Sequence, residues 1–265
     1  MKGGGIPEGA IGGVFSVSDT KKVYFSKGNL QYQSSPSLTL RFAENQYDYI
    51  GANNTASTGW RDLFSWGTGD DPTKMGSYDS YDTFNDWGSN AINNGGNTAN
   101  SGWRTLTGGT GGEWEYLFNT RTVNGGTGKG YSYTSNQKVN NVLGVVLYPD
   151  NYTGELYTTA QSDNWSTFEA AGCVFLPAAG YRYQQYTYFS TADVGYGGHY
   201  WSSTPEDTED DTIAYSIWFS GSSVATNHSD NRYIGESVRL VYDVTKTAHV
   251  IQDGDEDEDT VISTF

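Results

Sequence analysis

A stretch near the end of the chain, residues 180–241, constrains the fold most, because it contains many aromatic and very few aliphatic side chains. Its rings alternate with Gly, Ser, Asn and Thr. Alternation of two side-chain classes is typical of strands, whose successive side chains point to opposite faces. Tyr beside small polar residues is also the composition of surfaces that bind other molecules. We therefore interpret the rest of the chain as the platform that supports this stretch.

The remaining composition predicts a strand- and loop-rich protein. Apolar residues make up only 35% of the 265 residues, but 21 Tyr, 11 Phe and 8 Trp can fill a core with rings that bury a large area each. The 34 Gly, together with many Asn, Ser and Thr, favour turns and disfavour helix. No interior linker is evident, so we predict one domain over residues 1–242 and an acidic, flexible tail over residues 243–265.

Charge and hydropathy exclude two classes of partner. A net charge of −16 argues against nucleic acid, since phosphate binding needs clustered Lys and Arg. No segment approaches the roughly 20 apolar residues that span a membrane. The acidic run 253–259 is interpreted as a solvated tail, because it lacks the ligand spacing of an EF-hand calcium loop. Residues 1–5 contain no hydrophobic signal region, so either export follows another route or a leader has been removed.

Periodic patterns predict the first elements of the fold. Alternation over residues 14–26 and over residues 28–43 indicates two hairpins. Residues 142–149 and 174–177 are predicted as buried strands from their length and branching. Between residues 46 and 100 periodicity disappears, but large rings recur, so we expect an ordered loop with one helical turn over residues 61–67. The rings expected to pin this loop are Trp60, Phe64, Trp66, Tyr78, Tyr81, Phe84 and Trp87.

Two short helices are predicted, over residues 113–121 and 165–171. In the first, Trp114, Leu117 and Phe118 lie at positions i, i+3 and i+4 and share one face. Its acidic residues lie near its start and Arg121 at its end, as the helix dipole favours. In the second, Gly172 provides the stop.

The sequence predicts no metal and no other cofactor. The three histidines, His199, His228 and His249, are separated by loops and lack a second His or Cys at ligand spacing, which argues against zinc. Cys173 is the single cysteine and stands in an apolar run, so we expect a buried, inert thiol. Calcium bound by the acidic loop of residues 204–212 stays an open but weak alternative.

No motif requires an enzyme. The carboxylates that could suggest glycoside hydrolysis share the single polar loop 204–212, where solvated charge is the simpler interpretation. The glycines at 108–112 lack the Gly-Lys-Ser/Thr ending of a phosphate-binding loop and are interpreted as the lead-in to a helix. A Gly-x-Ser-x-Gly nucleophile motif is absent. We therefore predict a protein without catalytic residues.

Several segments together resemble a known superfamily. They are residues 23–32, 103–106, 113–117, 175–182, 200–204, 214–219, 231–232 and 235–241. This set is similar to the C-type lectin-like domains of the formylglycine-generating-enzyme (sulfatase-modifying) superfamily, in the branch common in gut Bacteroidales and their phages. The resemblance implies an α+β, C-type lectin-like fold that is strand- and loop-rich, with two short helices and a long ordered-loop region.

Two functions of such domains find no matching residues. The formylglycine-generating enzymes use a cysteine pair near the last strands, where this chain has no thiol. Calcium-dependent sugar-binding lectins carry Glu-Pro-Asn or Gln-Pro-Asp and a Trp-Asn-Asp strand, and this chain has none of these.

The resemblance extends to the variable proteins of diversity-generating retroelements, which present a rewritten binding face on a fixed scaffold. It implies a non-enzymatic receptor- or prey-recognition protein whose partner is a protein or glycan on another cell or particle, located extracellularly, at a cell surface or on a phage particle. The alternative is a static cell-surface adhesin or structural surface protein. The predicted ligand-binding residues are Tyr183, Tyr186, Tyr196, His199, Ser216, Trp218, Ser220, Asn227, Asp230 and Tyr233. The predicted frame is Trp201, Ser202, Phe219, Gly235, Val238, Arg239 and Leu240.

Trp218 is the predicted anchor of this face. If Ile217 and Phe219 point inward, then Ser216, Trp218 and Ser220 share the outward face. The alternative is that these rings fill the core. Adenine-directed mutation of Asn codons cannot produce Trp or Gln, so Trp218 either belongs to the frame or the protein does not diversify.

Overall fold

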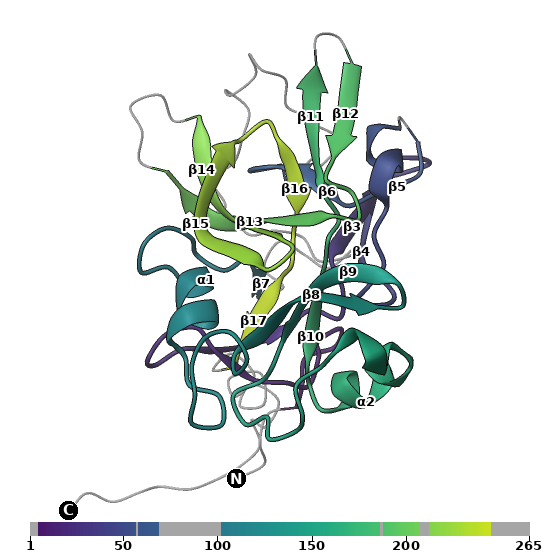
Figure 1. Ribbon diagram of the computed structural model, residues 1–265. Helices are drawn as coiled ribbons and strands as arrows, with labels where there is room; N and C mark the ends of the chain where they lie inside the picture. Colours follow the sequence, from purple (N-terminus) through teal and green to yellow (C-terminus); the bar gives the residue numbers. More distant parts are fainter. Residues whose placement is uncertain (1–4, 57, 69–101, 186–187, 207–211, 245–265) are drawn as a thin grey trace, which may run out of the picture.

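The structure is a computed structural model that describes residues 5–56, 58–68, 102–185, 188–206 and 212–244 (Figure 1). It is an α+β structure dominated by strands, with two short α-helices among the described residues. The helical elements are η1 (Gly51–Thr55), α1 (Glu113–Glu115), η2 (Tyr116–Thr120), η3 (Thr159–Asn164) and α2 (Trp165–Ala170). None of them is long and apolar enough to cross a membrane. The acidic run 253–259 lies outside the described residues.

The described strands form four sheets. The largest has the order β12-β11-β16-β13-β14-β15, with β6 paired to β16; the others have the orders β1-β2-β17-β7, β10-β9-β8 and β4-β3-β5. The first strands are β1 (Phe15–Ser16), β2 (Lys22–Phe25), β3 (Leu30–Gln33), β4 (Thr39–Phe42), β5 (Trp60–Arg61), β6 (Leu63–Ser65), β7 (Trp103–Arg104), β8 (Tyr133–Val139) and β9 (Val142–Leu147). The later strands are β10 (Val174–Pro177), β11 (Tyr181–Gln185), β12 (Tyr188–Ala192), β13 (Gly197–Pro205), β14 (Ile213–Ser220), β15 (Ser223–Asn231), β16 (Gly235–Ser237) and β17 (Val241–Asp243).

The predicted hairpins and buried strands are confirmed. β1 pairs with β2 and β3 pairs with β4, both antiparallel. β9 and β10, predicted as buried strands, pair with each other. β17 lies between β2 and β7, with Val241 opposite Phe25, so segments from the two ends of the chain share one sheet.

The two predicted helices are also confirmed. Trp114, Leu117 and Phe118 are all fully buried, as their spacing predicts. Arg121, at the end of this helix, is buried as well; its Nε donates to the Leu117 carbonyl and its Nη1 lies 3.2 Å from Asp150. Gly172 follows α2 with a φ of +87°, a conformation that glycine adopts without strain.

Aromatic rings fill the core, as the composition predicts. Three clusters of buried residues contain rings packed edge to face, for example Phe15 on Phe25 at 5.1 Å between centroids. Cys173 is fully buried in the third cluster, and burial raises the pKa of its thiol to about 12, so the thiol is inert at neutral pH.

The helical turn predicted over residues 61–67 is wrong. This segment forms strands β5 and β6, and β6 pairs with β16 from the far end of the chain. The long-range pairing and full burial of Leu63 and Phe64 outweigh the local preference of the sequence. Trp66 is fully buried, as expected of a pinning ring, whereas Tyr78, Tyr81, Phe84 and Trp87 lie outside the described residues.

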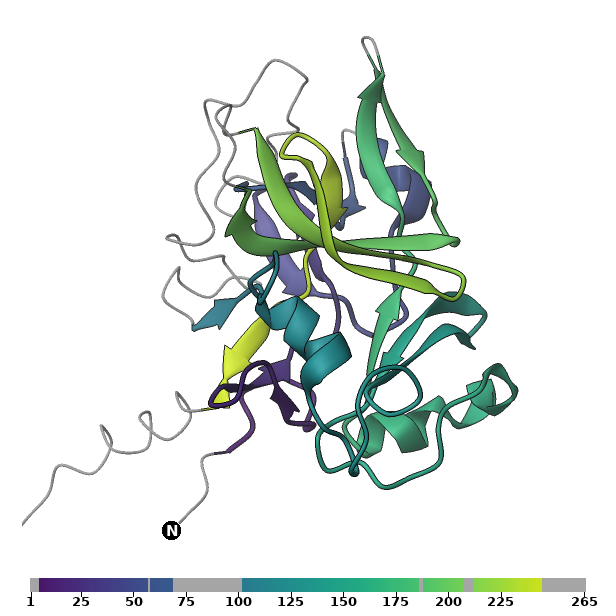
Figure 2. The same ribbon diagram turned by 60° about the vertical axis from the view of Figure 1, so that its left-hand side comes forward.

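The largest sheet positions the residues that the sequence singled out. The β11–β12 hairpin projects at the top of Figure 1, beside the β13–β15 strands. Figure 2 shows α1 and η2 against the face of β15 that is turned toward the rest of the molecule. One side of β13–β15 is thus covered by helix and core, and the other side carries the site.

Candidate functional site

The pairing of β13 with β14 divides their side chains between two faces. Tyr200, Ile217 and Phe219 belong to the first core cluster, so the predicted inward direction of Ile217 and Phe219 is confirmed. On the opposite face, His199 is paired with Trp218 and Trp201 is paired with Ser216. Trp218 and Ser220 are half-buried, whereas His199 and Ser216 are buried. The predicted outward face therefore has a buried floor, formed by His199 and Ser216, and a more exposed rim, formed by Trp218 and Ser220.

A bulge in β15 separates two predicted residues. Ser216 is opposite His228 and Trp218 is opposite Ala225, so Thr226 and Asn227 together face Ile217. Asn227 is exposed and its Nδ2 donates to Thr110 Oγ1 at 3.2 Å, in the loop before α1. Asn227 thus lies on the helix side of the sheet, away from the site. After the bulge, His228 and Asp230 alternate onto the site face.

Tyrosines of β11 close one side of the floor. The ring of Tyr181 lies 4.7 Å from that of His199 and 5.8 Å from that of Tyr183, between centroids. The His199 ring also contacts the rings of Trp218 at 6.5 Å and His228 at 6.2 Å. Four strands of one sheet therefore direct aromatic or imidazole rings toward a common point.

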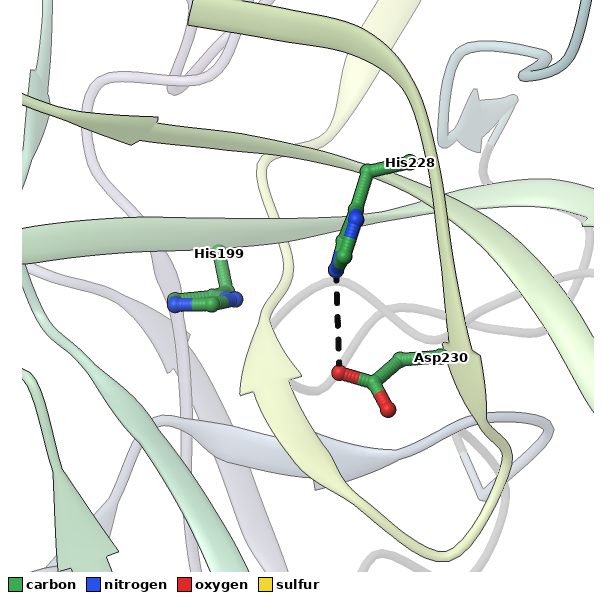
Figure 3. Close-up of side chains that lie close together, drawn as sticks. All are labelled: His199, His228 and Asp230. Atoms are coloured by element: carbon green, nitrogen blue, oxygen red, sulfur yellow. Dashed lines mark ion pairs between the residues drawn. The ribbon is translucent and has the colours of Figure 1, made fainter. Parts of the chain in front are cut away.

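His199, His228 and Asp230 form a cluster that we call the histidine–aspartate cluster. One possible ligand atom from each residue lies within 4.8 Å of the other two. His228 Nε2 is 3.8 Å from Asp230 Oδ2, and Figure 3 shows a ring nitrogen of His199 turned toward this pair. The small side chain of Ser216, on β14 between the two histidine strands, leaves the space in which the rings approach.

A buried carboxylate stands beside this cluster. Glu236, on β16, is 0% exposed, and its Oε1 lies 3.9 Å from His199 Nδ1. No hydrogen bond of good geometry reaches either Glu236 oxygen or either His199 nitrogen from a described residue, and the nearby Ser216 hydroxyl offsets the burial of Glu236 only in part. Asp193, in the turn before β13, brings its Oδ2 to 3.5 Å from His199 Nε2, at the long limit of a hydrogen bond. Buried polar groups without partners are rare in native proteins and indicate a role beyond packing.

Burial controls the protonation of this region. It lowers the pKa of His199 to about 4, and the positive charge of His228 adds to the shift, while Asp193 and Asp230 oppose it. Burial also raises the pKa of Glu236 well above its usual range, and the negative charge of Asp230 raises it further. His199 is therefore uncharged at pH 7 in the protein without a bound ligand, and burial favours the protonated form of Glu236.

The other predicted ligand-binding residues lie farther from the histidine–aspartate cluster or outside the described residues. Tyr196 is 66% exposed in the same turn as Asp193. Ser220 lies at the end of β14, and Tyr233 packs on the second core cluster between β15 and β16. Tyr186 lies outside the described residues. The predicted frame is buried throughout: Trp201, Ser202, Phe219, Gly235, Val238, Arg239 and Leu240.

Sequence reasoning missed four residues of the site, namely Tyr181, Asp193, His228 and Glu236. The i, i+2 spacing of His228 and Asp230 could have placed them on one strand face. Glu236 is the single acidic residue in the segment 234–241, which is buried throughout, and a buried acid of this kind indicates a functional or paired group. The approach of His199 to His228 depends on the β13-β14-β15 order, which the spacing of histidines along the chain does not contain.

A surface hollow also lies away from the candidate site. It has a volume of about 560 Å³ and is lined by the 151–155 loop, η3 and α2. Its lining combines one carboxylate, Glu155, with amide, hydroxyl and aromatic side chains. We regard it as a surface groove, since the groups with unusual chemistry gather on the largest sheet instead.

Comparison with known proteins gives one match. Residues 130–241 match the model of a family described as a domain of unknown function (DUF8237). No curated protein and no solved structure matches the chain. The matched segment contains Asp193, His199, His228, Asp230 and Glu236, so these residues of the candidate site all lie within the part of the chain that resembles this family.

Proposed function

We propose that this protein is a non-enzymatic ligand-binding protein with a C-type lectin-like fold, and that its recognition face is the outer side of β11, β13, β14 and β15. Its partner is a protein or glycan on another cell or particle, met outside the cell, at a cell surface or on a phage particle. The strand-rich architecture with two short helices agrees with this fold class. A crystal structure that fails to superpose on a C-type lectin-like domain would contradict the fold assignment.

The observation that carries the proposal is the convergence of residues selected from sequence alone. Tyr183, His199, Ser216, Trp218 and Asp230 come from four strands and lie on one side of one sheet. The residues interpreted as frame are buried beneath and around them. A buried frame with a rim of half-buried rings is the arrangement in which a few side chains dominate binding energy.

The chemistry of the rim suits recognition. Tyr and Trp offer large contact areas and lose little rotamer freedom on binding. Tyr196, exposed at the turn before β13, and Trp218, half-buried at the centre, are the two rings best placed to contact a partner. His228 and Asp230 add polar groups that fix orientation.

Two versions of this function differ in whether the face varies. In the first, the protein is the target of a diversity-generating retroelement; in the second, it is a static adhesin or structural surface protein. A reverse transcriptase gene beside this gene, with an adenine-rich repeat of the segment encoding residues 180–241, would establish the first. Without such a repeat the static version holds.

The binding face is tested with a double variant, Trp218→Ala with Tyr196→Ala. The labelled full chain is applied to a glycan array and to intact cells of gut Bacteroidales. We expect saturable binding by the native protein and a loss of at least about tenfold in the variant, because central aromatic rings carry most of the energy of such interfaces. Melting temperatures are compared in parallel.

Tyr131→Ala is the matched control, since Tyr131 is 53% exposed and lies away from the site sheet, just before β8. It should bind like the native protein. Retained binding by the double variant would contradict the proposal, and so would unfolding of that variant, which would place its rings in the core. Ester hydrolysis by the native protein that is lost in His228→Ala would contradict the non-enzymatic assignment.

A further inference from the structure

We propose that His199, His228 and Asp230 bind a divalent transition-metal ion, with Zn²⁺ as the best-fitting ion, and that Asp193 and Glu236 support it from either side of His199. The metal-site proposal depends on the geometry of these five residues and not on the proposed function. Ligand recognition at the surrounding face does not require it.

The residue types and their number suit the ion. Two imidazoles and one carboxylate are a common ligand set for zinc sites that keep an open coordination position. The same set with open positions also binds ferrous iron. Calcium is a poor fit, because it prefers oxygen ligands only. The calcium alternative at the 204–212 loop is therefore not extended to this site.

The distances need only a small adjustment. Ligand atoms about 2.0–2.1 Å from a tetrahedral ion lie about 3.3 Å apart. His228 Nε2 and Asp230 Oδ2 are already 3.8 Å apart, and the three ligand atoms lie within 4.8 Å of one another. His228 and Asp230 are half-exposed, so their side chains have room to rotate toward the ion, while buried His199 provides a fixed point.

Asp193 determines which nitrogen of His199 binds the ion. Its Oδ2 lies 3.5 Å from Nε2, which favours the tautomer with the proton on Nε2 and leaves the lone pair of Nδ1 for the ion. A carboxylate behind a ligating histidine fixes the ring tautomer and orientation, and its loss commonly lowers metal affinity 10–100-fold.

Glu236 supplies the strongest indication that a cation belongs here. Its carboxyl group is fully buried, with Oε1 3.9 Å from His199 Nδ1, and the described group that interacts favourably with it is the neutral Ser216 hydroxyl rather than a cation. An uncompensated buried carboxylate is costly. A dication held by Asp230 would compensate Glu236 once Glu236 has released its proton, and the Glu236 carboxylate could then accept a hydrogen bond from metal-bound water.

The open coordination position would face the rim. His228 and Asp230 are 37% and 27% exposed in their side chains, whereas His199 and Glu236 close the inner side. A metal ion there would offer a vacant position to a carboxylate, hydroxyl or imidazole of a molecule bound between Trp218 and the β11 tyrosines.

The test uses the full chain, stripped with EDTA and dialysed, and the metal alone as probe. Zn²⁺ is titrated calorimetrically, and Co²⁺ is titrated by its visible absorption and then displaced by Zn²⁺. We expect one equivalent of tight binding and a zinc-dependent rise in melting temperature. His228→Ala and Asp230→Ala should each lower the affinity at least tenfold, and Asp193→Asn about 10–100-fold.

The control is Asn227→Ala, the neighbour of His228 that points to the opposite side of the sheet. It should bind zinc like the native protein, with circular dichroism confirming that every variant folds. Equal zinc affinity in the native protein and a His228→Ala, Asp230→Ala double variant would overturn the proposal, because any bound metal would then sit on the acidic tail. Loss of zinc with retained glycan or cell binding would separate the two proposals.

Discussion

Two buried carboxylates on neighbouring strands differ in how their oxygens are satisfied. Asp62, between β5 and β6, accepts hydrogen bonds from the Ile50 N–H at 3.0 Å and from Asn54 Nδ2 at 2.8 Å. Glu236, paired opposite Phe64 on β6, accepts no hydrogen bond of good geometry from described residues and has only the Ser216 hydroxyl as a nearby donor. Both are 0% exposed. A buried acid whose hydrogen bonds are complete holds the fold together, whereas one without partners indicates a site that something else completes.

Arg239, three residues after Glu236, is a second buried charged residue whose hydrogen-bond partners can be compared with those of Glu236. It is fully buried, and its terminal nitrogens donate to Gln46 Oε1 at 2.8 Å and to the Phe175 carbonyl at 3.3 Å. Gln46 in turn accepts from the Phe175 N–H. These bonds tie the segment between β4 and η1, and strand β10, to the last strands. Burial and charge alone therefore do not distinguish the platform from the site. Arg239 has partners at its two terminal nitrogens, although its Nε has none, whereas neither Glu236 oxygen has one of good geometry.

The largest expected effect is the loss of the Asp62 carboxylate. Asp62→Ala leaves the Ile50 N–H without its acceptor and removes one of the two acceptors of Asn54 Nδ2, which keeps the Gly51 carbonyl; each unmet hydrogen bond costs about 1–3 kcal/mol. We expect the free energy of unfolding to fall by about 2–5 kcal/mol in urea denaturation. An unchanged urea midpoint would show that water replaces the carboxylate and would break the comparison with Glu236.

The second prediction concerns the pH dependence of stability. Burial raises the pKa of Asp62 from 3.8 to about 6, although its hydrogen bonds with Asn54 and Ile50 lower it in part. The folded protein then holds this proton more tightly than the unfolded chain, so stability falls as pH rises from about 4 to about 6 and is constant above. The shift of about two pKa units corresponds to about 3 kcal/mol.

This contribution is isolated by comparison with Asp62→Asn. Urea denaturation at several pH values between 4 and 7 should show a falling difference in stability between native protein and variant. Parallel curves of unfolding free energy against pH for the two proteins would mean that Asp62 titrates near its ordinary pKa. The hydrogen bonds would then stabilise the ionised carboxylate as much as burial destabilises it.

The sequence predicts the parts of this molecule whose signals are local. Alternation and turn residues are enough for the β1–β2 and β3–β4 hairpins, and the spacing of Trp114, Leu117 and Phe118 is enough for the first helix. The segment 61–67 was mispredicted because its structure depends on pairing with β16, more than 160 residues away along the chain. Local preference carries no information about such a partner.

The candidate site divides in the same way. The resemblance selected Tyr183, His199, Ser216, Trp218 and Asp230, which the sheet brings together. It also selected Asn227, which the β15 bulge turns to the other side, since a one-residue shift in a strand exchanges its faces. His228 and Glu236 were missed because their importance arises from proximity to His199 across strands.

The smallest expected effect on stability is that of Glu236→Gln, and it sharpens the comparison most. The amide keeps the shape of the side chain, and no described donor loses its acceptor, so unfolding of the metal-free protein should change by less than about 1 kcal/mol. The zinc-dependent rise in melting temperature should shrink, because the amide cannot supply the negative charge that the Glu236 carboxylate would place beside the ion. A loss of several kcal/mol without metal would instead place Glu236 beside Asp62, as an acid that holds the fold.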